Sequence, residues 1–212
     1  MADIYYMHID EARKIPVSFM QEHFPRRYQE AQRYRFEADR LRAYAAGTLL
    51  WERFGDVEAH ILFGDYGKPY FARASTQFNL SHSGTIALLA TSECMVGTDV
   101  ERCSEKNLPL AKKVFTPAEQ IWMEQDPVMR FTRLWTLKES VMKALGKGLQ
   151  LAPESFEVLP LTQGGSIEIE GVKLFGFTEN LQEYTVSVCE TEPIHALHLQ
   201  QICAADVLTK ES

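Results

Sequence analysis

The sequence has few cysteines, no long apolar run and no excess of basic residues, and each shortage excludes a class of protein. Its four cysteines are spaced too irregularly for a zinc motif, and nothing else in 212 residues requires them to pair, so we expect free thiols. Apolar runs far shorter than the roughly 20 residues of a membrane helix predict no membrane span. A net charge of −7 opposes nonspecific binding to nucleic acid, which needs cations to neutralise phosphates.

Several nucleotide and metal motifs are also missing. There is no Walker A sequence, no kinase glycine-rich loop and no His-Glu-x-x-His pair, so enzymes that depend on these motifs are disfavoured. The first residues, Met-Ala-Asp-Ile-Tyr-Tyr, carry an early acid and no basic-then-apolar leader, so we expect a cytoplasmic protein. What the sequence does contain is 45% hydrophobic residues, enough for the core of one large domain or of two packed halves.

The most informative stretch is a predicted helix that starts at residue 127. Asp126 is a typical N-cap, Pro127 suits the first helical position, and Gly146 marks the end, which predicts a helix of about 19 residues. Glu139 and Lys143 are four residues apart and therefore share one face of this helix. A solvated ion pair would explain them without any chemistry.

Strands and helices alternate in blocks along the rest of the chain. β-forming residues predict strands at 4–9, 60–63, 78–90 and 95–102, and later at 156–159, 166–170, 173–177, 184–189 and 195–203. Helical periodicity runs from about residue 16 to residue 51. This order predicts an α+β fold made of two similar α/β halves, 1–98 and 99–212, that meet near residue 100.

Basic residues gather in one part of the acidic chain. Residues 26–42 hold six arginines against three acids, a local excess of +3. The six are Arg26, Arg27, Arg33, Arg35, Arg40 and Arg42. Either they form a solvated helix face with ion pairs four residues apart, or they form a dock for an anion. The sequence leaves both interpretations open.

Three carboxylates are the strongest candidates for chemistry. Asp99 and Glu101 are separated by one residue, so on a strand their side chains point the same way. Like charges on one face either look into solvent or share a cation. Together with Glu139 and nearby cations they suit Mg²⁺, which takes oxygen ligands and substrate phosphates. This inventory favours transfer at phosphorus.

Three other polar residues have simple structural explanations. Glu119 follows Thr116 and Pro117 as the last member of a capping box, in which its carboxylate reaches back to the cap amide. His82 lies in a Ser-His-Ser-Gly corner, where a satisfied loop histidine is common. Lys68 lies on a glycine-proline turn, where a lysine is usually solubilising. Taken singly, none of the three predicts a site.

Five segments together resemble the 4′-phosphopantetheinyl transferase superfamily, specifically its surfactin-synthetase-activating (Sfp) type. That family has Gly-hydrophobic-Asp-x-Glu, followed by Trp-(Ser/Thr/Cys)-x-Lys-Glu-(Ala/Ser)-x-x-Lys. The chain has Val-Gly-Thr-Asp-Val-Glu at 96–101 and Trp-Thr-Leu-Lys-Glu-Ser-Val-Met-Lys at 135–143. In the family's order, it also has Tyr-Gly-Lys-Pro at 66–69, Phe-Asn-Leu-Ser-His-Ser at 78–83 and Gly-Lys-Gly-Leu at 146–149. Thr98 departs from the usual Val or Ile but is also β-branched.

The resemblance implies a pseudo-twofold arrangement of the halves, an active site between them, and a monomer. It implies transfer of the phosphopantetheine arm of coenzyme A to a serine of an apo acyl or peptidyl carrier protein, with release of adenosine 3′,5′-bisphosphate. The carrier is usually acidic, so Lys112 and Lys113 are candidate contacts. One alternative is a module that binds coenzyme A or the carrier without turnover. Another is a different Mg²⁺ phosphoesterase.

The same resemblance assigns roles to residues of this sequence. Asp99, Glu101 and Glu139 would hold Mg²⁺. Glu139, directly or through a metal-bound water, would take the serine proton, and Lys143 would meet the phosphate in transit. His82 joins Glu139 and Lys143 in the predicted catalytic set. The expected coenzyme A contacts are Arg27, Arg42, Lys68, Ser81, His82, Lys138 and Lys143.

Overall fold

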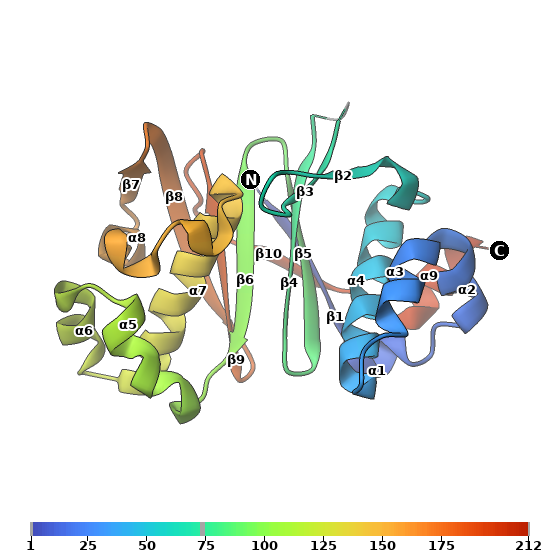
Figure 1. Cartoon of the computed structure of the whole chain (residues 1–212), viewed down its shortest axis with the longest axis horizontal. Helices are drawn as coiled ribbons and strands as arrows, with labels where there is room; N and C mark the ends of the chain where they lie inside the picture. The colour runs from blue at the N-terminus through green and yellow to red at the C-terminus, as the bar shows by residue number, and fades with distance from the viewer. Residues whose placement is uncertain (1, 73–74, 212) are drawn as a thin grey trace.

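In the part of the chain that the structure describes, two four-stranded sheets pack against each other and the helices lie outside them (Figure 1). This computed structural model describes residues 2–72 and 75–211. The long helices α4 (Glu37–Phe54) and α7 (Pro127–Leu145) cover opposite outer sides. The predicted α+β class is confirmed.

The first sheet collects strands from both ends of the chain. Its order is β10-β1-β5-β4, with β10 parallel to β1 and the other neighbours antiparallel. The bounds are Asp3–His8 (β1), Gln77–Ser83 (β4), Ile86–Ser92 (β5) and His198–Gln201 (β10). β5 is buried along its whole length, because one face meets α4 and the other meets the second sheet.

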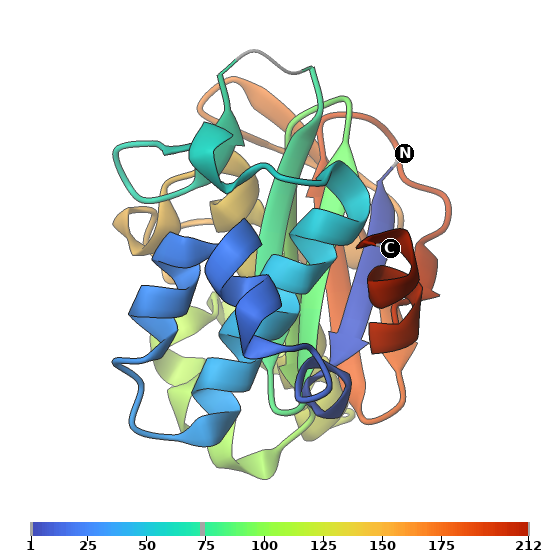
Figure 2. The ribbon, with the colours of Figure 1, turned by 90° about the vertical axis from the view of Figure 1, so that its right-hand side faces the viewer.

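Small elements complete the first half of the molecule. They are α1 (Ile9–Ala12), α2 (Val17–His23), α3 (Pro25–Ala31), a 3₁₀ turn at Glu58–His60, and a hairpin of β2 (Ile61–Phe63) with β3 (Pro69–Phe71). Figure 2 looks onto these helices and shows the C-terminal helix α9 (Ala204–Glu211) on the same side. The chain therefore ends by returning to its first half through β10 and α9. The expected halves, 1–98 and 99–212, assign this returning segment to the second half.

The second sheet is antiparallel throughout and has the order β6-β9-β8-β7. Its strands are β6 (Val96–Arg102), β7 (Ser166–Ile169), β8 (Val172–Leu181) and β9 (Tyr184–Glu190). Around it lie α5 (Ala111–Val114), α6 (Pro117–Met123), α8 (Leu159–Thr162) and 3₁₀ turns at Glu105–Leu110, Gly148–Gln150 and Pro153–Ser155. The strand predicted at 156–159 is wrong, because the chain there leads from a 3₁₀ turn into α8.

Helix α7 has the length and ends that the sequence predicts. The side chain of Asp126 caps its first turn, and Gly146 ends it in the left-handed region with φ 68°. The amides of Gly146 and Lys147 bond back to the carbonyls of Lys143 and Met142, each at 3.1 Å. Among residues 2–72 and 75–211, every helix, this one included, is too short or too polar to cross a membrane.

The two sheets also meet edge to edge, where β4 lies beside β6. Three alternate side chains of β4 accept hydrogen bonds from three alternate backbone amides of β6. The pairs are Thr98 N to Asn79 Oδ1 (3.0 Å), Val100 N to Ser81 Oγ (3.3 Å) and Arg102 N to Ser83 Oγ (3.2 Å). We call these contacts the seam. Side chains thus satisfy an edge of β6 that another backbone would satisfy in a continuous sheet.

Candidate active site

A cavity of about 560 Å³ opens between the halves, where α4 and β4 face β6 and α7. Every residue predicted for the site lines it except Lys68 and Lys138. Those that line it are Arg27, Arg42, Ser81, His82, Asp99, Glu101, Glu139 and Lys143. The arginines come from the first half and the carboxylates from the second, so the cavity depends on both halves.

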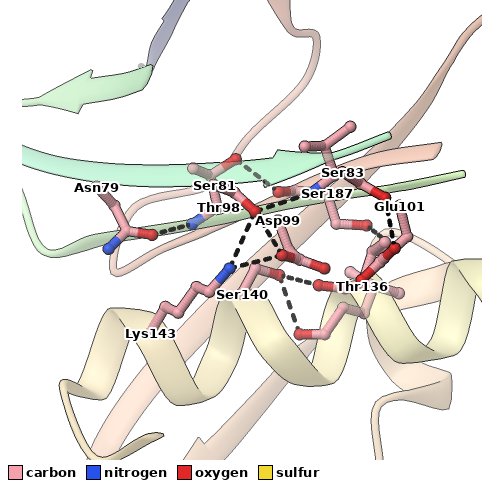
Figure 3. A network of polar contacts seen from close by, with 12 residues as sticks. Asn79, Ser81, Ser83, Thr98, Asp99, Glu101, Thr136, Ser140, Lys143 and Ser187 are labelled. Atoms are coloured by element: carbon pink, nitrogen blue, oxygen red, sulfur yellow. Dashed lines mark hydrogen bonds and ion pairs between the residues drawn. The ribbon is translucent and has the colours of Figure 1, made fainter. Parts of the chain in front are cut away.

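Serines of β4 hold the two carboxylates of β6 (Figure 3). Ser81 Oγ donates to Asp99 Oδ1 and Ser83 Oγ donates to Glu101 Oε2, each at 2.7 Å. Both serines also belong to the seam, so the same two hydroxyls join the sheets and orient the acids. Lys143 reaches this point from α7, with its Nζ 2.6 Å from Asp99 Oδ1 and 3.1 Å from Ser81 Oγ.

The carboxylates lie close enough to affect one another's ionisation. Burial raises the pKa of Glu139, and the charges of Asp99 and Glu101 raise it further against the opposing effect of Lys143. Burial also raises the pKa of Glu101, with Asp99 adding to the rise and the hydrogen bond from Ser83 opposing it. A carboxylate with a raised pKa is a better proton acceptor near neutral pH than an exposed one.

The donor set fits a hard cation. Asp99 Oδ2 is buried and has no hydrogen-bond partner in the described ranges. Such an oxygen is costly unless a cation or donor meets it, and Mg²⁺ takes carboxylate oxygens. The acids are not gathered around one point, because among residues 2–72 and 75–211 no three His, Cys, Asp or Glu side chains are placed to hold a metal ion. Coordination by all three carboxylates therefore requires their side chains to adjust.

Arg27, Arg42 and His82 form the basic side of the cavity. The Nε of Arg27 is buried without a partner in the described part of the chain, and burial lowers the pKa of this guanidinium. Gly47 makes room for the arginine, since an added Cβ would lie 3.1 Å from Arg27 Cδ. Arg42 donates through Nε to the carbonyl of Gly84 at 2.9 Å. Burial, and next the charge of Arg42, lower the pKa of His82.

The arginines of residues 26–42 were expected to form either a solvated helix face or a dock for an anion, and each interpretation applies to some of them. Arg27 and Arg42 line the cavity, which favours the anion dock for these two. Arg33 and Arg35 are exposed, as a solvated helix or loop face predicts. The charge excess alone did not distinguish them, because exposure depends on how α3 and α4 pack.

Lys138, a predicted contact of coenzyme A, does not line the cavity in this structure. Its side chain and that of Glu119 are each 0% exposed, with Nζ 2.8 Å from Oε2. Nζ also donates to the carbonyls of Pro153 and Phe156. The capping box at Glu119 is confirmed, and its Oε1 accepts the amide of Val158 at 2.8 Å. Because successive helical residues point about 100° apart, the neighbour of a cavity residue lies on another side of α7.

Lys68 is the second predicted residue that lies outside the cavity. Its Nζ donates to the main-chain carbonyls of Val96 at 3.0 Å and Ala144 at 2.7 Å. The ammonium group is therefore not in solvent, as a solubilising lysine would be, and the predicted contact of Lys68 to the nucleotide stays a prediction.

Sequence reasoning missed Asn79 and Ser83, which build the seam. A usable signal was present, since residues 79, 81 and 83 are polar at the strand period and must share one face. It was missed because Ser81 and Ser83 also fit the polar corner at 81–84. Tyr34 and Asp39 also line the cavity, and no pattern in the sequence separates them from ordinary exposed helix residues.

Comparison with known proteins fits this geometry. A family model described as the 4′-phosphopantetheinyl transferase superfamily matches residues 95–192, which include β6, α7 and the three carboxylates. A protein of Bacillus subtilis named 4′-phosphopantetheinyl transferase is 34% identical over 161 residues, covering 69% of this chain and 70% of that protein. The chain belongs to the 4′-phosphopantetheinyl transferase superfamily.

Two further members of the superfamily differ in how much of them the chain covers. The 4′-phosphopantetheinyl transferase gsp of Aneurinibacillus migulanus is 41% identical over 103 residues, which is 46% of this chain and 43% of that protein. The 4′-phosphopantetheinyl transferase psf-1 of Bacillus pumilus is 28% identical over 196 residues, 85% of this chain and 84% of that protein. The chain thus matches less than half the length of the first and most of the second. The resemblance found in the sequence segments is confirmed.

Proposed function

We propose that this chain transfers the 4′-phosphopantetheine group of coenzyme A to a serine hydroxyl of an apo acyl or peptidyl carrier protein, with release of adenosine 3′,5′-bisphosphate. The observation that carries the proposal is the cavity in which carboxylates of β6 and α7 face arginines and a histidine of the first half. The family model covers the carboxylate side, and the relatives are named for this activity.

The basic wall suits the phosphates of coenzyme A. Arg27 offers a guanidinium whose buried Nε lacks a partner in the described ranges, and phosphate oxygens are strong acceptors for such donors. Arg42 and His82 lie on the same wall, with Ser81 beside them. Burial lowers the pKa of His82, which favours the neutral ring, and either ring form can donate a hydrogen bond to a phosphate oxygen.

Glu139 is the candidate acceptor for the serine proton. Its raised pKa favours taking that proton while the serine Oγ forms a bond to phosphorus. The bond between phosphorus and the bridging pyrophosphate oxygen breaks, and the nucleotide bisphosphate leaves with that oxygen. Lys143, one turn further along α7, would contact phosphate oxygens and stabilise the charge that develops there.

Asp99, Glu101 and Glu139 are the residues that would hold Mg²⁺, which when bound neutralises charge on the pyrophosphate. The unpartnered Oδ2 of Asp99 supports this assignment. So do the raised pKa values of Glu101 and Glu139, since a shared cation relieves the repulsion that contributes to both shifts.

Three further parts of the proposal concern symmetry, partner and state. The strand orders β1-β5-β4 and β6-β9-β8 support a pseudo-twofold relation, because in each an earlier strand (β1 or β6) pairs antiparallel with the second strand of a hairpin (β4–β5 or β8–β9). We place the acidic carrier beside Lys112 and Lys113, which are exposed on α5. A monomeric, cytoplasmic enzyme with no nucleic-acid or membrane partner stays a prediction.

The proposal is tested by incubating the protein with coenzyme A, Mg²⁺ and an apo carrier protein, and then measuring the intact mass of the carrier. We expect a gain of one phosphopantetheine group, which disappears when the carrier serine is replaced by alanine. Absence of any gain on acyl and peptidyl carriers would contradict the proposal. Stable binding of coenzyme A without a mass gain would instead favour the binding module.

A further inference from the structure

Lys68 connects the two halves of the molecule at the end of the seam. It lies on the turn between β2 and β3, which is closed by a hydrogen bond from Gly64 N to Lys68 O at 2.9 Å. From this turn of the first half, its ammonium group reaches into the second half and donates to Val96 O and Ala144 O. Val96 opens β6, and Ala144 lies in the last turn of α7.

The end of α7 explains why a cation sits there. The capping hydrogen bonds described above use the carbonyls of Met142 and Lys143, and the next carbonyl, that of Ala144, accepts from Lys68. Positive charge is favourable at a helix C-terminus because the peptide dipoles leave partial negative charge at that end. The stem of Lys68 packs on Gly146, where an added Cβ would lie 3.3 Å from Lys68 Cδ.

At the same place the backbone of α7 closely approaches that of β6. An added Cβ on Gly97 would lie 2.1 Å from the carbonyl oxygen of Ser140 and 2.2 Å from the amide nitrogen of Ala144, so the two backbones are in direct contact. Lys68 bonds to the residue before Gly97 on β6 and to the contacting Ala144 on α7. It therefore holds both partners of this contact at once.

We propose that Lys68 is a positioning residue, which ties the β2–β3 turn to β6 and α7 and so sets how Lys143 meets Asp99. Asp99 follows Gly97 by two residues on β6, and Lys143 directly precedes Ala144 on α7. A shift of α7 along or away from β6 would change the 2.6 Å contact between Lys143 Nζ and Asp99 Oδ1. This inference rests on the proposed function only where transfer is the measured quantity.

Transfer kinetics separate positioning from nucleotide contact. For Lys68→Met we expect kcat to fall by about tenfold or more while KM for coenzyme A changes less than about twofold, because alignment is lost and the basic wall is intact. Lys68→Arg, which keeps charge and donors, should recover part of the loss. Lys147→Met, which removes a partly exposed lysine at the same helix end, is the matched control. A tenfold rise in KM with unchanged kcat would overturn the proposal.

A measurement of stability tests the same contacts of Lys68 and does not depend on transfer activity. Burial lowers the pKa of Lys68 from 10.5 to about 8. Between these values the unfolded chain binds more protons than the folded one, so the contribution of Lys68 to stability rises with pH. The other titratable residues that line the adjoining cavities are the same in the wild type and in Lys68→Met. They are Lys143 on α7, Tyr66 and Tyr70 at the hairpin, and Glu93.

We therefore expect the urea midpoint of the wild type to rise relative to that of Lys68→Met as the pH goes from 7.5 to 9.5, with no such trend for Lys147→Met. If the difference in urea midpoint between the wild type and Lys68→Met stayed constant with pH, the ammonium group of Lys68 would be in solvent and would not bond to β6 and α7. If the wild type transferred nothing to any carrier, the proposed function would fail while this measurement would still decide the position of Lys68.

Discussion

Two clusters of charged side chains lie on different sides of helix α7, and they differ in how well their polar atoms are satisfied. Around Lys138, three acceptors surround one ammonium group, and Glu119 accepts from two backbone amides. Around Lys143, one oxygen of Asp99 has no partner in the described ranges, and the pKa of Glu139 is raised. The first cluster is closed to solvent, and the second lines a cavity.

The difference separates structure from function on a single helix. In a closed cluster every polar group has its partner inside the protein. Its role is therefore structural, because it holds α6, α7 and the loop that follows α7 together. An open cluster has charge and lone pairs in excess of its partners, which is unfavourable unless a ligand meets them. Both clusters use the same residue types, so the count of charges does not tell them apart.

The largest expected effect is the loss of transfer in Glu139→Gln. The amide cannot accept the serine proton and removes one negative charge from the cavity, so we expect kcat to fall at least about 100-fold. Transfer is measured from the mass of the carrier under single-turnover conditions. Glu168→Gln, which changes an exposed glutamate of β7, should behave as the wild type. Near-normal turnover of Glu139→Gln at saturating Mg²⁺ would show that Glu139 is not the acceptor of the serine proton.

In the closed cluster, Lys138→Met should lower the free energy of unfolding by about 3–5 kcal/mol, because it leaves the carboxylate of Glu119 buried without its cation. Adding Glu119→Gln should recover part of this loss, since the uncompensated charge is then gone. Lys113→Met, at an exposed position, is expected to change stability by less than about 0.5 kcal/mol. Urea unfolding measures all of these variants. No recovery in the double variant would mean that the ion pair is not what holds this region.

The smallest effect concerns the basic wall that faces the open cluster. Arg27→Ala should raise KM for coenzyme A by about tenfold, because charge-assisted hydrogen bonds to phosphate contribute about 1.5–3 kcal/mol. If Arg27 meets the 3′-phosphate, KM for dephospho-coenzyme A should stay the same, which steady-state kinetics with both substrates can measure. The exposed Arg33→Ala serves as the control. An equal rise for both substrates would place Arg27 at another phosphate.

Local signals in the sequence predicted the elements that local rules govern. The ends of α7 follow from Asp126 and Gly146, and the capping box from Thr116 and Glu119, since each depends on residues a few positions apart. The strand at 156–159 was wrong because its apolar residues pack as part of a turn and a short helix. β10 pairs with β1 across the length of the chain, and no local pattern indicates such a pairing.

For the candidate site, the sequence predicted the members better than their individual roles. The motif residues on β6 and α7 do meet in one cavity with Arg27 and His82. Lys138 of the α7 motif and Lys68 of the Tyr-Gly-Lys-Pro segment turn inward to carbonyls instead, because a long side chain on a turn or helix can reach in more than one direction. Which direction it takes depends on the acceptors that packing supplies, and those come from distant parts of the chain.

The unfolding free energies of Glu139→Gln and Lys138→Met, measured by urea denaturation beside the wild type, test most directly whether the open cluster costs stability and the closed one supplies it. We predict that Glu139→Gln is as stable as the wild type or more stable, because it relieves the repulsion with Asp99 and Glu101. Lys138→Met should be the less stable variant by several kcal/mol. If Glu139→Gln lost as much stability as Lys138→Met, the cavity carboxylates would be structural and the distinction between the clusters would be wrong.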